Sequence, residues 1–445
     1  MANFNFATLT NAQAALSSRL YDATQQQWPA AELTLYIVEA LRTWNALTSF
    51  WRNEFTFSLA SGVVFYDITN LTVAPNTLRP ITVTDGYLAQ MIETHLLEPL
   101  TSSYPLTWSG SLQFDVAMIL DAITRRQNET LGQTGCTITR QTVTAPMTNA
   151  GILLGDSTID IRRVAWLPGS LYPVTILRET DRWAKWAYDY TYTAAVPAPP
   201  NTWMQSTDPP PQFKVDRIPP VSGNYEVLTA NAGNTANATA AQLLSVPDDW
   251  SWVVKWGALG DLLSRESNAK DQPRATYCQK RYLEGLMFLQ NSGAVLELEL
   301  NGVPMGVDAI TNGDAFNWQW EAAAQAPPNR CYQSGFNLLA FPPPDAGGYT
   351  ALVGVVENAP VPVAGGDFIQ CNRADYDVIL DYAQHVAMFK IPALFAETIP
   401  LYQNFLNRAA VYNRKLRAMG SFNWAQWDIS QTEEERNPRM EAAAQ

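Results

Sequence analysis

Two stretches of this chain, about 125 residues apart, repeat one order of residue types. The first contains Phe213, Ile218-Pro219-Pro220, Tyr225 and Asp249-Trp250, and the second contains Phe336, Phe341-Pro342-Pro343, Tyr349 and Asp375-Tyr376. In each, an alternating strand meets a Pro-Pro turn, a return strand with Gly and Tyr follows, and an aromatic-rich helix comes next. The echo predicts an internal duplication of a β-plus-helix unit within an α+β fold.

The pattern changes along the chain predict a helical body with inserted antiparallel β domains. Apolar residues from Leu33 to Leu47 recur at three-to-four spacing, which is typical of a helix. Residues 55–68 alternate around Ser61-Gly62, which predicts a β-hairpin. The predicted segments are 1–135 (helical body with the hairpin), 136–245 (β domain), 246–292 (helical), 293–371 (second β domain), 372–420 (C-terminal helices) and 421–445 (extended tail).

Composition excludes several classes of protein. A net charge of -13 argues against broad gripping of nucleic acid, because such affinity comes from basic groups that neutralise phosphates. An acidic surface is still compatible with a passage through which DNA slides without sticking. The four cysteines are widely separated, so they predict reduced, buried thiols rather than a zinc site or a disulfide framework. No secretion signal or membrane-spanning apolar run occurs, so we expect a cytoplasmic protein that spans no membrane.

Few residues are candidates for chemistry. The two histidines, His95 and His385, fall in no recognisable nucleophile or acid-base motif, and we expect both to be structural. Residues 308–319 resemble a calcium loop, but Ile310 and Gln319 occupy positions where that loop needs oxygen ligands. A tight turn at Asn312-Gly313 is the better interpretation. We therefore expect no catalytic residue, no metal and no cofactor.

Two clusters of side chains are candidates for interaction. The first is a row of aromatic residues at alternate positions, Trp186, Tyr188, Tyr190 and Tyr192, which on a strand would share one face. Such a face either binds sugar rings or packs against another layer or subunit, and the abundance of Trp and Tyr along the whole chain favours packing. The second cluster is basic and lies near the end of the last helix: Arg408, Arg414, Lys415 and Arg417. These residues either complement the helix dipole or contact DNA or an acidic partner.

Several segments together carry a resemblance to a known family. They are the runs from Leu16 to Asp22 (LSSRLYD), Glu32-Leu33, Ile37 to Arg42 (IVEALR) with Trp44, Ile159 to Trp166 (IDIRRVAW), Pro219-Pro220 to Tyr225, and Leu244 to Asp248 (LSVPD) leading into Trp256 to Leu259 (WGAL). Over residues 9–289 the chain resembles the head-to-tail connector, or adaptor, proteins of tailed bacteriophages.

The resemblance implies a structural protein of the virion, without enzymatic activity, that is assembled in the host cytoplasm. It implies a homo-oligomeric ring, commonly a dodecamer, that lies between the portal protein and the tail proteins and surrounds the DNA channel during ejection. In that family a C-terminal segment often reaches into the portal. The segment in that position here is 421–445, with Phe422, Trp424 and Trp427 as the possible portal or subunit anchors.

The chain departs from the smaller adaptors in its length, because the second β-plus-helix copy beyond Ala294 has no counterpart in them. Two alternatives therefore stay open. One is a neck or tail protein that anchors fibres. The other is a carbohydrate-binding or depolymerising protein, which would use the aromatic row with a carboxylate pair such as Asp181 and Asp189.

Overall fold

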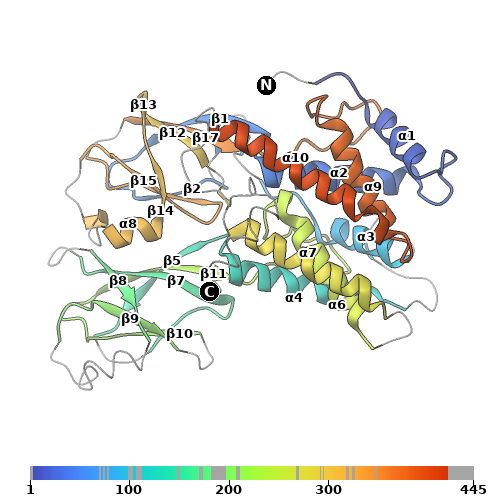
Figure 1. Cartoon of the computed structure of the whole chain (residues 1–445). Coiled ribbons are helices and arrows are strands. Elements are labelled where there is room, and N and C mark those ends of the chain that lie inside the picture. Colours follow the sequence, from blue (N-terminus) through green and yellow to red (C-terminus); the bar gives the residue numbers. More distant parts are fainter. Residues whose placement is uncertain are drawn as a thin grey trace, which may run out of the picture.

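The protein has an α+β fold in which the helices gather on one side and the sheets on the other (Figure 1). The computed structural model describes residues 4–69, 72–73, 76–77, 80–98, 104–106, 113–147, 151–169, 174–181, 197–206, 211–266, 270–290, 292–293, 295–316, 320–322, 326–345 and 348–418. The fold class predicted from the sequence is confirmed.

The helical body is built from segments at both ends and in the middle of the chain. Its helices are α1 (Leu9–Arg19), α2 (Ala30–Thr48), α3 (Asp85–Leu96), α4 (Val116–Thr134), α6 (Ser251–Ser264), α7 (Gln272–Gln290), α9 (Tyr376–Met388) and α10 (Ile399–Ala418), with short 3-10 turns η2 (Asp248–Trp250) and η4 (Phe395–Thr398). Local signals set several boundaries. Thr84 Oγ1 accepts a hydrogen bond from Tyr87 N at 3.2 Å at the start of α3, and Gly135 ends α4 in the left-handed conformation. The buried face of α2 contacts α1, α9 and α10, so the two ends of the chain share one bundle.

Within the part of the chain that the structure describes, the strands form three sheets of four or more strands and one small ribbon. The largest has the order β5 (Thr139–Ala145), β11 (Gly223–Asn231), β7 (Thr158–Leu167), β8 (Thr175–Glu179), β9 (Thr202–Gln205), β10 (Gln212–Val215) and β6 (Ile152–Leu153). A second sheet has the order β1 (Arg52–Leu59), β17 (Tyr349–Val356), β12 (Val295–Leu300) and β13 (Val303–Pro304). A third has the order β14 (Val307–Ala309), β15 (Cys331–Ser334), β16 (Leu338–Ala340) and β2 (Phe65–Asp67), and β3 (Thr72–Val73) pairs with β4 (Asn76–Thr77).

The predicted hairpin in residues 55–68 is wrong. Both strands and the turn exist, and Gly62 has a φ of +71°, but β1 pairs with β17 and β2 pairs with β16. The turn is held from elsewhere in the chain, since the Gly62 N–H donates to the Pro344 carbonyl at 3.1 Å. The two strands therefore diverge after the turn and each joins the C-terminal β segment. The segment 293–371 builds its sheets with strands from the N-terminal third.

The two stretches whose similarity predicts a duplication have the same order of elements in the structure, but their strands pair differently. In the first copy β10 pairs with β9 and β6, while β11 pairs with β5 and β7. In the second copy β16 pairs with β15 and β2, while β17 pairs with β1 and β12. In neither copy does the second strand return along the first, and only in the first copy do both strands share a sheet. The predicted return strand is wrong, and the duplication stays a prediction.

The predicted turn at Asn312-Gly313 is also wrong, because these residues lie inside the short helix α8 (Ile310–Phe316). Gly313 is required there by packing rather than by a turn. A Cβ on Gly313 would lie 2.6 Å from Cε1 of Tyr332 on β15, a distance that atoms in proteins do not tolerate. The glycine lets α8 lie directly against the ring.

Among the described residues, the buried apolar side chains form one main cluster and two smaller ones. The main cluster joins the helical body to the sheet β1-β17-β12-β13, so these two parts share a core. The second lies within the seven-stranded sheet, and the third lies between that sheet and the sheet that contains β2. All four cysteines are free and buried, as the sequence predicts.

Candidate functional site

A groove on the surface of the helical body is the strongest candidate for an interaction site. Its volume is about 750 Å³, and α4, α6 and α7 form its walls. Its lining residues are Arg126, Gly260, Asp261, Ser264, Gln272, Ala275, Thr276, Gln279, Lys280, Leu283, Glu284 and Met287. The helices approach closely beside it because α6 has a glycine at position 257. A Cβ there would lie 2.9 Å from the Tyr282 ring and 3.0 Å from Cδ of Arg126.

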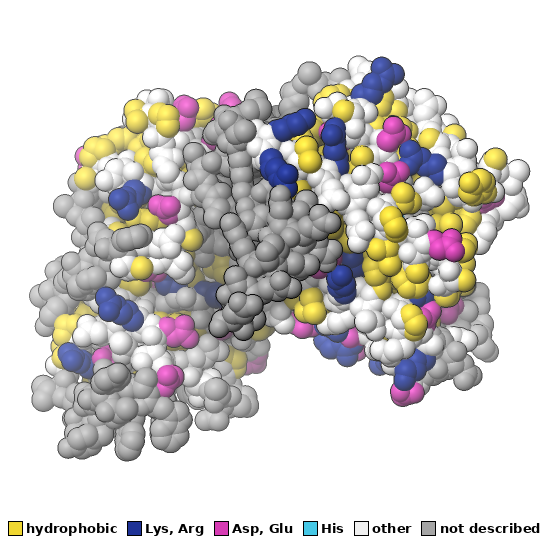
Figure 2. All heavy atoms as spheres, viewed as in Figure 1, with side chains coloured by type: hydrophobic (Ala, Val, Ile, Leu, Met, Phe, Trp, Pro, Cys, Tyr) yellow, Lys and Arg dark blue, Asp and Glu magenta, His cyan; other side chains and the backbone are white. Residues whose placement is uncertain are grey.

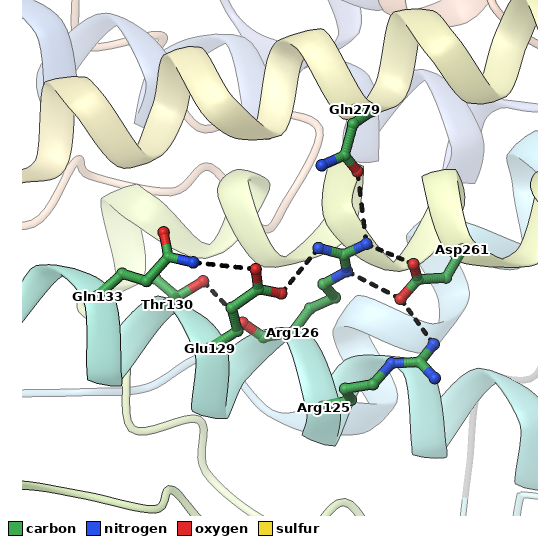
Figure 3. A network of polar contacts seen from close by, with 7 residues as sticks. All are labelled: Arg125, Arg126, Glu129, Thr130, Gln133, Asp261 and Gln279. Atoms are coloured by element: carbon green, nitrogen blue, oxygen red, sulfur yellow. Dashed lines mark hydrogen bonds and ion pairs between the residues drawn. The ribbon is translucent and has the colours of Figure 1, made fainter. Parts of the chain in front are cut away.

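An ion-pair network fixes the three helices around the groove (Figure 3). Arg126 on α4 donates from Nε to Asp261 Oδ2 on α6 at 2.8 Å and from Nη1 to Glu129 Oε2 at 2.7 Å. Arg125 also donates to Asp261, at 2.6 Å, and Gln279 on α7 accepts a long bond of 3.4 Å from Arg126. The hydrogen bonds to Asp261 are the largest cause of a raised pKa for Arg126, so its guanidinium stays charged.

The wall contributed by α7 has an apolar side chain that faces solvent. Leu283 is 54% exposed, and it follows the exposed Lys280 by three positions on the same helix. The Lys280 ammonium lies 4.0 Å from Glu284, which also accepts a hydrogen bond from Tyr402 at 3.1 Å. Hydrophobic side chains gather more widely over the helical half of the molecule in this view, interrupted by charged ones (Figure 2). A groove with a mixed apolar and charged lining is suited to contact another protein surface.

A second group of polar residues lies in the interior of the helical body. The Lys255 ammonium on α6 contacts the Glu39 carboxylate on α2, and its Nζ lies 3.3 Å from Nε2 of His95 on α3. The Tyr382 hydroxyl on α9 donates to Glu39 Oε1 at 3.2 Å. Burial lowers the pKa of Lys255 to about 8 and lowers that of His95 well below its usual value. His95 is therefore neutral near pH 7 and accepts a hydrogen bond from the ammonium.

The second histidine lies in a neighbouring buried contact. Nε2 of His385 on α9 is 2.5 Å from the Tyr277 hydroxyl, and its Nδ1 is 2.8 Å from Thr398 Oγ1. Burial lowers the pKa of His385 to about 3, so this imidazole is also neutral at ordinary pH. Neither histidine is among the residues that line the groove. Both tie helices of the body together, which agrees with the structural role expected for them.

The same interior brings together two of the segments that carry the resemblance to connectors. Ile37–Arg42 and Trp44 lie on α2, while Leu244–Asp248 leads through η2 to Trp256–Leu259 on α6. Besides the Glu39–Lys255 pair, Asn45 at the end of α2 donates to Asp249 Oδ2 at 2.7 Å. The neighbouring acid, Asp248, accepts the Thr82 and Val83 backbone N–H groups at 2.9 and 3.0 Å. Two segments about 200 residues apart in the sequence thus form one packed unit.

The interaction residues predicted from the sequence are only partly described. The aromatic row Trp186, Tyr188, Tyr190 and Tyr192 and the tail residues Phe422, Trp424 and Trp427 lie outside the described residues. Of the basic cluster on α10, Arg408 donates to Asp375 Oδ1 at 2.8 Å, while Arg414 and Lys415 are exposed. The Arg408 pair joins α10 to the start of α9.

Sequence reasoning missed the groove. The available signal was the pattern of α7, where Leu283 and Met287 are four positions apart on a face that is otherwise polar. The groove itself depends on how three helices pack, and one helix does not reveal that.

Among the described residues, no helix is both long enough and apolar enough to cross a membrane, and no group of three or more acidic, histidine or cysteine side chains is placed to hold a metal ion. No protein-family model matches the chain, and no curated protein matches it.

Proposed function

We propose that this chain is a structural protein of a tailed-bacteriophage virion, a head-to-tail connector that forms a ring between the portal and the tail around the DNA channel. The observation that carries the proposal is the packing of α2, which contains Ile37–Arg42 and Trp44, against η2 and α6, which connect Leu244–Asp248 with Trp256–Leu259. These are segments on which the resemblance to connectors rests, and here they are parts of one packed unit. The segments that resemble connectors therefore belong to one folded body rather than to separate parts of the chain.

The groove between α4, α6 and α7 is the surface that we assign to contact between neighbouring copies in the ring. A ring uses two different patches on each subunit, so one patch must accept another. The groove has an ion-pair network that holds its walls in place and an exposed leucine at its rim. Rigid walls reduce the entropy lost on association, and covering the apolar side chain favours it.

The charge of the chain agrees with this role. A net charge of -13 disfavours tight binding to DNA phosphates, and a conduit functions only if DNA passes without being trapped. In this proposal the two histidines have no catalytic role, and the protein acts only through assembly. The partners are other copies of the chain, the portal protein and tail proteins, and the assembled location is the virion.

The decisive experiment measures the mass of the purified full-length chain, alone and after mixing with its cognate portal ring, by native mass spectrometry and light scattering. We expect a closed oligomer either alone or on the portal, with a copy number given by the mass. Cryo-electron microscopy of that complex then shows whether a continuous channel runs through it. A chain that stays monomeric and does not bind the portal refutes the proposed function.

A pair of variants tests the groove separately. Leu283→Asp places a charge at the rim of the groove, and we expect it to abolish ring formation or weaken it at least about tenfold, because burying an unpaired carboxylate is costly. Leu153→Asp changes a leucine that is 61% exposed on the distant strand β6, and we expect this control to assemble normally. If Leu283→Asp keeps its melting temperature and still forms rings, the groove is not the contact, although the ring itself stands.

A further inference from the structure

A buried charge cluster lies where the seven-stranded sheet meets the sheet that contains β2. The apolar cluster between these sheets includes Phe65, Ile138, Ala165, Ile176, Leu228, Ile310, Trp320, Tyr332, Leu338 and Ala340. Helix α8 and the 3-10 turn η3 (Trp320–Ala322) lie at this border, and α8 is seen just above β5 in Figure 1. Both elements are short, so they depend on tertiary contacts for their position.

Arg163 on β7 is the centre of the cluster. Its Nε donates to Asp314 Oδ2 on α8 at 2.8 Å, its Nη1 lies 3.3 Å from Glu226 Oε1 on β11, and its Nη2 contacts the Glu321 carboxylate on η3. The guanidinium carbon lies 5.6 Å from the centre of the Trp320 ring. A single arginine side chain thus connects the sheet to both short elements.

The charges in this cluster do not balance. The other cation is Arg140 on β5, which donates from Nε to Glu226 Oε2 at 2.8 Å. The cluster therefore holds two guanidinium groups and the three carboxylates of Glu226, Asp314 and Glu321. Arg163, Glu226 and Glu321 are at least nine-tenths buried. With every carboxylate ionised, the interior would carry an uncompensated negative charge, which is unfavourable in a medium of low polarity.

The excess charge falls on Glu321. The pKa of Glu321 is raised to about 7, chiefly by burial and also by the nearby Glu226 and Asp314, while Arg163 acts in the opposite direction. For Arg163, burial lowers the pKa, but the surrounding carboxylates raise it by more, so the guanidinium stays charged. One carboxylate is then neutral below neutral pH, and it becomes charged as the pH rises above 7.

We propose that the cluster of Arg163, Glu226, Asp314 and Glu321 is a proton-dependent latch that holds α8 and η3 against the seven-stranded sheet. With a proton bound, the cluster is neutral and the latch is closed. When the proton leaves, the buried cluster acquires a net negative charge, and separation of α8 and η3 from the sheet becomes more favourable because it exposes Glu321 to water. The latch operates whether or not the chain forms rings.

Linkage gives the size of the effect. If the Glu321 carboxyl has its ordinary pKa of 4.5 in the open state and about 7 in the closed state, the opening equilibrium rises about tenfold between pH 6 and pH 8.5. The direction follows from proton binding. The closed state holds the proton over a range in which the open state has lost it, so raising the pH favours the open state.

Hydrogen exchange of the full-length protein tests the latch. Peptides that cover residues 308–322 are followed at pH 6 and pH 8.5, with the intrinsic exchange rate at each pH divided out. We expect the wild-type protein to lose about tenfold in protection at the higher pH. Glu321→Gln keeps the neutral form at every pH, so its protection should not change. Glu297→Gln on β12, an exposed glutamate, is the control and should behave as the wild type does.

Removing a neighbouring charge provides an independent test. Asp314→Asn leaves Arg163 with one carboxylate fewer to balance and takes a negative charge away from Glu321, so the pH at which protection falls should move downward. The raised pKa of Glu321 owes part of its shift to Asp314, which predicts a downward move. If Glu321→Gln does not fold, this variant decides the question. An unchanged midpoint in Asp314→Asn, or a pH response in Glu321→Gln equal to that of the wild type, overturns the latch.

Discussion

The buried pair of Glu39 and Lys255 offers the sharpest test of what holds the helical body together. The Lys255 side chain is fully buried, and its pKa falls from 10.5 to about 8 even with Glu39 in contact. At about 1.4 kcal/mol per pKa unit, that difference corresponds to roughly 3 kcal/mol against the charged form in the folded protein. Glu39 therefore compensates only part of the cost of burying the ammonium.

The perturbation is Glu39→Gln, which keeps the shape and removes the counter-ion. We expect it to lower the free energy of unfolding by about 3–5 kcal/mol at pH 7, because a buried charge is left without its partner. The double variant Glu39→Gln/Lys255→Met removes both charges and should recover to within about 1–2 kcal/mol of the wild type. The assay is urea unfolding followed by circular dichroism in the helical region, with all variants at one protein concentration.

The pH dependence gives a second readout with a definite sign. Because folding lowers the pKa of Lys255, the unfolded chain binds more protons than the folded protein between about pH 8 and pH 10.5. This group therefore makes the wild type more stable as the pH rises through that window, relative to the double variant. The reasoning is refuted if the double variant is no more stable than Glu39→Gln alone, or if the difference between the wild type and the double variant does not change over the window.

Three further predictions concern packing, a surface network and the thiols. Gly285→Ala should lower the free energy of unfolding by about 1–3 kcal/mol, because the added Cβ would lie 2.7 Å from Val253 on α6. Gly366→Ala is the control: no atom lies within 4 Å of its Cβ, so the free energy of urea unfolding should change by less than about 0.5 kcal/mol. Asp261→Asn removes a carboxylate bound by two arginines and should lower the free energy of unfolding by about 1–3 kcal/mol in the same assay. The control Glu266→Gln breaks an exposed ion pair and should lower it by less than about 0.5 kcal/mol. Burial raises the pKa of Cys278, and all four thiols are buried, so a thiol reagent at pH 8 should modify them only after denaturation; rapid labelling of the native protein would contradict the packing described.

Local signals were enough to predict most helices and many strands. The apolar spacing on α2 and the acidic start at Asp248 depend only on neighbouring residues, and the structure has helical elements in both places. The fold class follows from the same patterns, since a helical period and an alternating period occur in separate stretches of the chain.

Long-range pairing could not be predicted from such signals. Ser61-Gly62 has the chemistry of a hairpin turn, yet Phe55 on β1 lies opposite Val353, almost 300 residues away. Asn312-Gly313 has the chemistry of a turn, but Gly313 serves the approach of α8 to the Tyr332 ring. In both cases a distant partner decided the conformation, and nothing in the adjacent residues identifies that partner.

For the candidate sites, too, local features could be predicted from the sequence and long-range contacts could not. The structural role expected for both histidines followed from the absence of a recognisable catalytic motif, but the partners of Lys255 and Arg163 come from segments far away in the sequence. A lone acid or base in a sequence does not indicate which opposite charge it will meet. The groove is likewise a property of three packed helices and has no signature in any one of them.

The pairing of β1 with β17 has a consequence for how the protein is made. Strand β1 is synthesised early, while its partner at residues 349–356 leaves the ribosome only after most of the chain has been translated. The N-terminal third therefore emerges with a strand that has no partner to bond, and contacts between such distant residues form slowly. Strands in this state are prone to join other chains. We expect premature termination before residue 349 to yield an aggregating product rather than a smaller soluble protein. The N-terminal third can complete its fold only after the C-terminal strand β17 has been synthesised.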